Sequence, residues 1–154
     1  MGHRSTASFG KRQEYIAVAE LLRRGFDVYM TLVDDQQIDC VVRQERKKSV
    51  RYLDIQIKAR SRDATHAATF AALTVRNPRP DFWFIFYSET IDTYWVVPSM
   101  DFVRLANVNK GGPSKAGKNI GKHTIKLANK NKAGWKARPK FKMYENAFEL
   151  LRYR

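Results

Sequence analysis

Long hydrophobic runs are absent from this sequence, and cysteine is almost absent. No stretch of about eighteen consecutive apolar residues occurs, so no segment is predicted to cross a membrane. The opening segment, MGHRSTASFGKRQE, lacks the apolar centre of a secretory signal. The single cysteine, Cys40, excludes an internal disulfide and a cysteine-rich zinc site. These absences predict a cytoplasmic protein.

Acidic residues are scarce relative to basic ones. The chain has 15 Asp and Glu residues against 29 Lys and Arg residues, which gives a formal net charge of +14. Residues 107–142 hold most of this excess, with ten lysines, one arginine and no acid. Such a segment suits a polyanion, most simply nucleic acid, although a solvated loop is the alternative.

The hydrophobic content of 44% over 154 residues is typical of one globular domain. We therefore expect a single domain, 1–154, that includes the Gly/Lys-rich segment 107–142. Helical spacing of apolar residues, stopped by Gly25, predicts a helix over 11–24. Alternating or β-branched runs predict strands at 26–33, 38–43, 50–58, 81–89, 93–97 and 123–128.

The remaining segments are less regular in sequence. Residues 63–73 are Ala-rich and fit a short helix or a loop. A helix with Ser99 as its N-cap is predicted to run to residue 106. The last segment, 144–154, is predicted to be a helix. Together these elements predict a mixed α/β domain with a central sheet.

The stretch YLDIQIKAR, residues 52–60, carries unlike polar groups on one face of its strand. Alternation places Gln56 and Lys58 together, and Asp39 of the preceding strand joins them if the apolar faces of the two strands coincide. Glu14 lies within the apolar stripe of the first helix, so its carboxylate should point to the sheet. Two carboxylates, an amide oxygen and the Ile57 carbonyl are hard ligands suited to Mg²⁺ or Mn²⁺. With Lys58 beside them, they favour phosphodiester hydrolysis.

This pattern resembles the PD-(D/E)XK nuclease superfamily, which has the restriction-endonuclease-like fold. The stretches that carry the resemblance are GKRQEYIAVAELLRRGFDV, QQIDCVV and YLDIQIKAR, with a looser match in FWFIFYS and TYWVVPSMDF. Gln56 in place of an acid is similar to the QxK variant, seen in Mrr-type restriction nucleases and intron homing endonucleases. The resemblance implies an α/β fold with a mixed central sheet flanked by helices.

The resemblance also implies a role for each motif residue. Asp39 would be the central metal ligand, Gln56 would fill the slot of the usual acid, and Lys58 would be the catalytic lysine. Glu14 would complete the metal site, and Ile57 would add its carbonyl. Because Gln56 removes one negative charge, weaker metal affinity is expected, and Asp35 and Asp54 are nearby acids able to compensate.

The expected function is that of a Mg²⁺- or Mn²⁺-dependent DNA endonuclease, of a homing, restriction or resolvase-like type. The resemblance also implies one active site per chain, so cutting both strands of a duplex would need a homo-oligomer. A catalytically inactive DNA- or RNA-binding module of the same fold is the alternative, as is an RNA-binding protein whose acidic cluster is structural. Trp135 is expected either to contact nucleic acid or to dock the basic segment on the core. The residues expected to contact nucleic acid are Arg60, Arg62, Lys115, Lys118, Lys122, Lys130, Lys132, Trp135 and Lys136.

Overall fold

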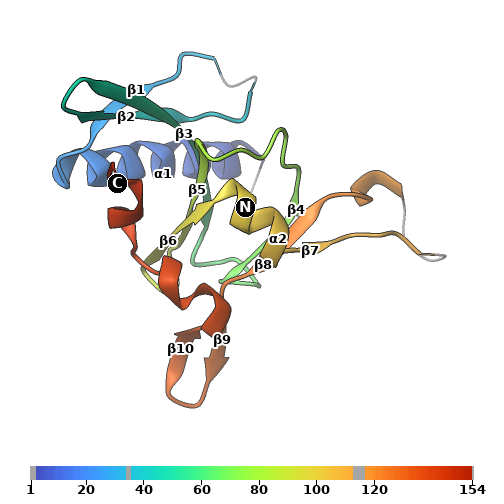
Figure 1. The fold of residues 1–154 in the computed structure, drawn as a ribbon. Helices are drawn as coiled ribbons and strands as arrows, with labels where there is room; N and C mark the ends of the chain where they lie inside the picture. The colour runs from blue at the N-terminus through green and yellow to red at the C-terminus, as the bar shows by residue number, and fades with distance from the viewer. Residues whose placement is uncertain (1–2, 34–35, 113–116, 154) are drawn as a thin grey trace.

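The computed structural model describes residues 3–33, 36–112 and 117–153. Its centre is a five-stranded sheet beside a long helix, α1 (His3–Arg23) (Figure 1). The strands lie in the order β1 (Asp27–Met30), β2 (Cys40–Arg46), β3 (Ser49–Arg60), β5 (Phe82–Ser88) and β6 (Thr93–Pro98). Only β3 and β5 pair in parallel, and the other neighbours are antiparallel. The first three predicted strands therefore pair in chain order as an antiparallel meander.

The two faces of this sheet bury different side chains. On one face Cys40, Ile55 and Ile85 pack against α1. On the other face Phe84, Phe86 and Trp95 pack around Phe102 of the short helix α2 (Ser99–Leu105). The alternation of side chains along each strand explains why β5 is buried on both faces.

The first helix is longer than predicted and ends where predicted. It begins near residue 3 rather than residue 11. At its end Gly25 adopts a φ of 83°, and the Gly25 and Phe26 N–H groups bond to the carbonyls of Leu22 and Leu21. This is a Schellman ending, in which glycine accepts the left-handed conformation. The buried Phe26 then directs the chain into β1.

Two predicted strand and cap details are wrong. The first strand ends at Met30, and Leu32 and Val33, which were expected to lie within it, are exposed beyond it. Ser99 does not cap α2, because it is the first residue of the helix after Pro98. Its hydroxyl instead donates to the Arg79 carbonyl and accepts from the Arg79 N–H, at 2.8 and 3.0 Å.

Residues 63–73 were expected to be helix or loop but contain a strand, β4 (Thr69–Leu73). This strand pairs with β8 (His123–Lys126), which also pairs with β7 (Asn107–Val108). The strand predicted at 123–128 is thus confirmed as β8. The strand that pairs with β4 lies more than fifty residues later in the sequence, so no local sequence pattern predicts this pairing.

The predicted C-terminal helix is wrong. Two 3-10 turns, η2 (Pro139–Tyr144) and η3 (Phe148–Leu151), replace it. Between them Asn146 adopts a φ of 49°, which interrupts any helix. Its backbone N–H donates to the Tyr94 carbonyl at 2.7 Å, and its side-chain oxygen accepts from the Tyr94 N–H at 3.1 Å. Pairing with β6 has therefore overridden the helical apolar spacing.

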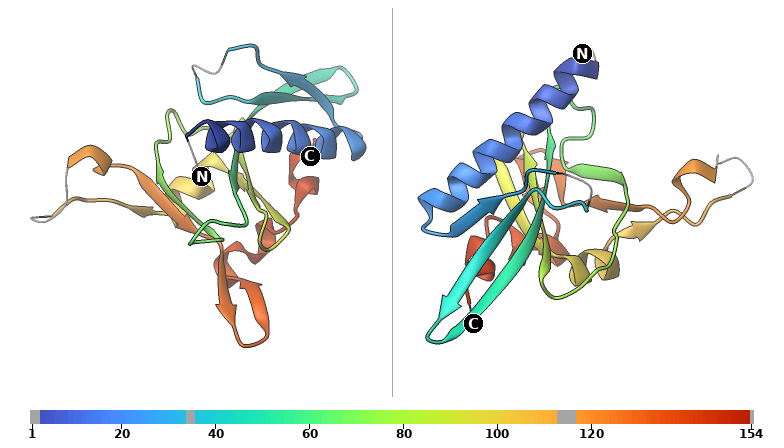
Figure 2. Two further views of the ribbon diagram at one scale, coloured as in Figure 1. Left: turned by 180° about the vertical axis from the view of Figure 1, so that it is seen from behind. Right: turned by 90° about the horizontal axis from the view of Figure 1, so that it is seen from above.

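The basic segment forms two projections rather than one loop. The first is an arm built on β7 and β8, with a 3-10 turn, η1 (Gly117–Asn119), towards its tip. The second is a hairpin of β9 (Ala128–Asn131) and β10 (Gly134–Ala137). The views in Figure 2 show that the arm and the hairpin extend from the core in different directions. No helix in the described part of the chain is long and apolar enough to cross a membrane.

Candidate active site

Asp39 lies immediately before β2 and is buried, with 8% of its surface exposed. Its backbone N–H donates to the Ile55 carbonyl at 2.8 Å, and its carbonyl accepts from the Thr31 N–H at 3.3 Å. Its carboxylate oxygen Oδ2 accepts the Ile57 N–H at 2.6 Å. Contacts to two neighbouring strand segments therefore fix both its backbone and its side chain.

The strands β2 and β3 diverge at this point. Cys40 and Ile55 form the last regular pair, and beyond them the Asp39 carboxylate takes the place of a backbone acceptor for the Ile57 N–H. In a strand the N–H and C=O of one residue point to the same side. The Ile57 carbonyl therefore also points towards the gap that β2 leaves.

Glu14 approaches this strand end from α1. Its side chain is only 17% exposed and forms an ion pair with Lys11 at 2.6 Å. Glu14, Lys11 and Asp39 line one cavity of about 210 Å³, together with Tyr15, Met30, Thr31 and Leu32. The prediction that Glu14 points inward rather than to solvent agrees with this placement.

The electrostatics show that Glu14 and Asp39 act on the same neighbours. The hydrogen bond that Lys11 donates to Glu14 raises the pKa of Lys11, and the charge of Asp39 acts in the same direction. Burial raises the pKa of the Cys40 thiol to about 12, and the charges of Asp39 and Glu14 add to this effect. A negative field of this kind attracts cations into the cavity.

Gln56 and Lys58 reach the same strand end from the other face of the sheet. In the parallel pairing of β3 with β5 they lie beside Phe84 and Phe86, on the face opposite α1. Gln56 is buried, whereas Lys58 is half-buried and forms no ion pair within the described residues. The structure thus brings Glu14 and Asp39 into one cavity, while Gln56 and Lys58 do not line it.

The donors at the strand end are of the hard type that Mg²⁺ and Mn²⁺ prefer. Within the described residues, no group of three or more His, Cys, Asp or Glu side chains is arranged to hold a metal ion. Asp54, which was considered as a compensating acid, pairs instead with Arg79. Asp35 lies outside the described residues. Any divalent ion would therefore rely on two carboxylates and on amide or carbonyl oxygens.

The two arginines after β3 are placed differently from each other. Arg60 lies on the face of Lys58, and its Nε donates to the His66 carbonyl at 3.2 Å. Arg62 is exposed, and its backbone is held by the Glu89 carboxylate, which accepts the Arg62 N–H at 2.8 Å. The Arg60 guanidinium and the Arg62 backbone are therefore held near the end of β3 that carries Lys58.

The lysines expected to contact nucleic acid are divided between the two projections. Lys118 and Lys122 belong to the arm, and Lys130, Lys132 and Lys136 belong to the hairpin. Lys115 lies outside the described residues. Among the described lysines of the basic segment, only Lys142 forms an ion pair with a carboxylate, that of Glu145. The remaining charges are available to an external polyanion.

Trp135 fits both roles predicted for it, since it docks the hairpin on the core and keeps part of its side chain open to a nucleic acid. It is half-buried and packs against the core on the α2 side of the sheet. In the antiparallel register it pairs with Lys130, whereas Lys136 pairs with Asn129 on the other face of the hairpin. Trp135 and Lys130 thus share a face, and Lys136 projects away from it.

Sequence reasoning missed two residues of the site. Lys11 lies three residues before Glu14, a helical spacing that brings the two side chains together and that could have revealed the pair. Thr31 fixes the backbone before β2 through its hydroxyl, which donates to the Ile38 carbonyl at 2.8 Å. No pattern in the sequence points to Thr31, because its role depends on the turn between β1 and β2.

Comparison with known proteins adds evidence on the fold. No family model and no curated protein matches the chain. Among solved structures the chain is similar to a bacterial homing endonuclease, I-Ssp6803I, with 19% sequence identity and a TM-score of 0.64. The similarity covers 96% of this chain and 93% of the other. The chain therefore has the nuclease-like mixed α/β fold of that endonuclease, which confirms the predicted fold class.

Proposed function

We propose that the chain is a metal-dependent endonuclease that hydrolyses phosphodiester bonds of duplex DNA, with a catalytic site of the QxK type. One observation carries the proposal. Glu14 and Asp39 meet in one cavity at the point where β2 and β3 diverge, on a fold shared with a homing endonuclease. Gln56 and Lys58 stand at the same strand end and complete the catalytic set.

The residues at the strand end fit Mg²⁺ or Mn²⁺. The ammonium of Lys11 already lies 2.6 Å from the Glu14 carboxylate, so this part of the cavity accepts a cation. In this cavity the ion would be held by Glu14 and Asp39, with the Ile57 carbonyl as a further donor at the gap between β2 and β3. Gln56 lies on the other face of β3 and does not line the cavity, so its amide oxygen would have to reach the ion past the strand end. When bound, the ion would lower the pKa of a water ligand and would offset negative charge on the phosphate.

The chain's own residues supply orientation and charge. The Ile57 N–H fixes the direction of the Asp39 carboxylate. Lys58, which no described carboxylate neutralises, would orient the attacking water or stabilise negative charge that develops on the phosphate. Gln56 gives the site one negative charge fewer than an acid would, so we expect modest affinity for the ion.

The basic projections would hold the DNA backbone. Lys118 of the arm and the lysines of the hairpin are exposed, and Lys122 of the arm is half-buried. Phosphate contacts from such lysines position a duplex without reading its sequence. One site per chain cuts one strand, so we propose that a dimer or higher oligomer cuts both. A non-catalytic nuclease-fold DNA- or RNA-binding module is the second candidate, and the uncharged Gln56 favours it.

Nicking of supercoiled plasmid with Mg²⁺ or Mn²⁺ tests the proposal. Wild-type protein should nick the plasmid only when the ion is present. Lys58→Ala should lose activity by about a hundredfold or more, because the group that acts on the water is removed. Its affinity for DNA should remain within about twofold of wild type, since many other cations contribute.

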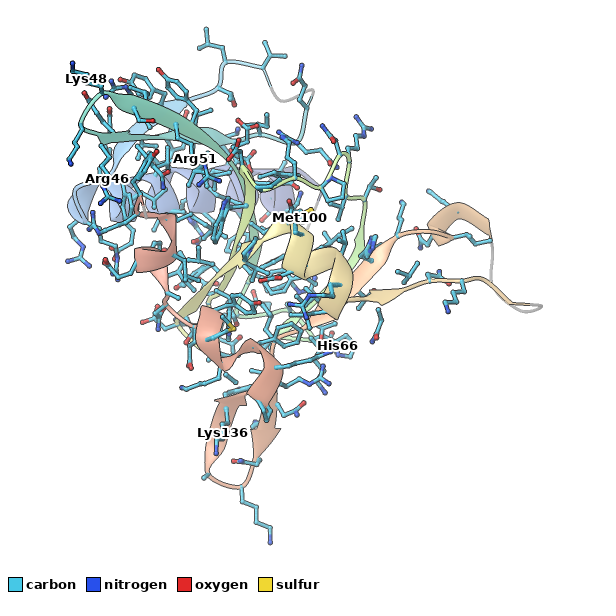
Figure 3. All side chains as sticks on the ribbon, viewed as in Figure 1. Arg46, Lys48, Arg51, His66, Met100 and Lys136 are labelled. Atoms are coloured by element: carbon cyan, nitrogen blue, oxygen red, sulfur yellow. The ribbon has the colours of Figure 1, made fainter. Side chains whose placement is uncertain are left out.

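Lys48→Ala is a matched control. Lys48 is an exposed lysine of the turn between β2 and β3 and is labelled in Figure 3. This variant should nick plasmid as wild type does. Tight, salt-sensitive DNA binding by a wild-type protein that never nicks would instead support the binding module.

A further inference from the structure

A second cavity, distinct from the candidate active site, lies between the segment before β4 and the β9–β10 hairpin. Its volume is about 330 Å³, at the small end of the range of ligand pockets. The cavity is held open by backbone bonds from Leu127 N–H to the Ala68 carbonyl and from Arg138 N–H to the Leu127 carbonyl, both 2.9 Å. These bonds anchor the hairpin to the second sheet, so the cavity is part of the fold.

The lining of this cavity combines a small apolar floor with an aromatic wall. The floor consists of Ala67, Ala68 and Ala128, which are 4%, 1% and 1% exposed. Alanine side chains leave space that larger residues would fill. Trp135 forms the wall, and its indole N–H has no hydrogen-bond acceptor among the described residues. An aromatic wall with a free donor suits a planar heterocycle.

The rim of the cavity is polar and basic. Lys126, Lys130 and His66 line it, and all three are exposed. Figure 3 labels His66 near β8 and Lys136 on the hairpin. Because Lys130 shares the face of Trp135, its ammonium can reach a phosphate attached to a base in the slot.

A basic path connects this rim with the candidate active site. Lys58 and Arg60 lie on one face of β3, two residues apart. The Arg60 Nε then donates to the His66 carbonyl at 3.2 Å, and His66 belongs to the rim. A strand whose phosphate lies at Lys58 would therefore pass the Arg60 guanidinium on its way towards Lys130 of the hairpin.

We propose that this cavity binds one unstacked nucleotide of the nucleic-acid strand, with its base against Trp135 and its phosphate at Lys130. The proposal rests on the proposed function, because it assigns a second binding position on the substrate of that site. A strand with an unpaired base near the cut, such as a bulge or a frayed end, would fill the cavity and be preferred. A free mononucleotide has the same chemistry but lacks the contacts along the basic path.

Fluorescence titration of the full chain with single-stranded oligothymidylate of about 12 nucleotides tests this. Trp135→Ala should weaken binding between roughly fivefold and a hundredfold, because a base loses its stacking partner. Trp135→Phe should restore most of the affinity, because the ring is retained. Lys130→Ala should weaken binding, whereas Lys136→Ala, on the other face of the same hairpin, should weaken it clearly less.

A measurement on the wild-type protein avoids dependence on a foldable variant. An oligonucleotide with a single 2-aminopurine in a bulge should change its fluorescence when bound, and the change should be absent for the same base within a fully paired duplex. Thymidine monophosphate should compete only at far higher concentration. Equal competition by the mononucleotide would overturn the assignment to a strand, and wild-type affinity of Trp135→Ala would overturn the site.

The test separates this proposal from the catalytic one. Lys58→Ala should lose nicking, and adding Trp135→Ala to that variant should still weaken its binding of single strands by the same factor as in wild type. Loss of nicking by Trp135→Ala with unchanged strand binding would overturn the cavity proposal alone. A wild-type protein that binds single strands through Trp135 but never nicks DNA would overturn the nuclease proposal alone.

Discussion

The ammonium of Lys11 lies in the same cavity as the two carboxylates of the candidate site, those of Glu14 and Asp39. Its ammonium bonds to Glu14, and the charge of Asp39 also acts on it. The side chain of Lys11 is 58% exposed, so it can leave the cavity without unfolding the helix. We infer that Lys11 competes with a divalent ion for Glu14.

Replacement of Lys11 by alanine should therefore strengthen ion binding. Lys11→Ala is expected to lower, by several-fold, the Mg²⁺ or Mn²⁺ concentration that gives half of the ion-dependent rise in melting temperature. Thermal melts at a series of ion concentrations measure this. Arg23→Ala, which breaks the corresponding pair with Glu20 further along α1, should leave the midpoint unchanged. An unchanged midpoint in Lys11→Ala would show that the ion does not use Glu14.

At the residue scale, the sequence was enough to predict which residues form much of the candidate site, but not how they are arranged in space. An acid within an apolar helical stripe must be partly buried, so the inward direction of Glu14 was predictable. The alternation of β3 predicted that Gln56 and Lys58 share a face, and the pairing with β5 confirms this. The approach of Glu14 from the opposite face, and the Asp39 bond to the Ile57 N–H, depend on how β2 and β3 diverge, which no local pattern specifies.

At the scale of elements, strands with a strong alternating or apolar pattern were predictable, and segments that depend on distant partners were not. The run that forms β5 is apolar throughout, and its identity as a strand follows from its sequence alone. Residues 69–73, in contrast, carry one large buried side chain, Phe70, and become β4 only because β8 offers a pairing partner. The C-terminal segment has helical spacing, yet its pairing with Tyr94 prevails.

Asn146 should therefore contribute measurably to the stability of the C-terminal segment. Asn146→Ala is expected to lower the free energy of unfolding by about 1–3 kcal/mol, because it removes the bond to the Tyr94 N–H and places alanine at a positive φ. Asn146→Gly should cost less, because glycine accepts this φ. Urea unfolding measures both. Asn119→Ala, at an exposed position without such a bond, serves as control, and equal stability of all three variants would contradict this role.

At the scale of the whole molecule, the basic segment 107–142 holds ten lysines and one arginine, and most of these charges lie on two projections that the fold keeps apart. If the arm and the hairpin contact the same duplex, their contributions to the DNA affinity should add. The salt dependence of binding counts these contacts, since each neutralised phosphate adds about 0.9 to the slope of log K against log salt.

Paired substitutions should reveal both projections. Lys118→Ala with Lys122→Ala in the arm, and Lys132→Ala with Lys136→Ala in the hairpin, should each lower the slope by up to about 1.8. Fluorescence anisotropy at several salt concentrations measures the slope. Arg46→Ala with Lys48→Ala removes the same charge from the β2–β3 end of the sheet and should change the slope little (Figure 3). A slope insensitive to the hairpin pair would show that only the arm meets the duplex.

The covering of β6 has a consequence for self-association. Asn146 bonds to Tyr94 and Glu145 forms a bridge to Trp95, so both residues cover the outer edge of β6. The backbone groups of this edge are therefore not free to pair with a strand from another molecule. Within the described residues, the opposite border of the central sheet is β1, which exposes Tyr29 and Met30. An edge strand of this kind can pair with a β-strand of another chain. We therefore expect aggregation or strand exchange in concentrated samples to begin at β1 and to spare β6.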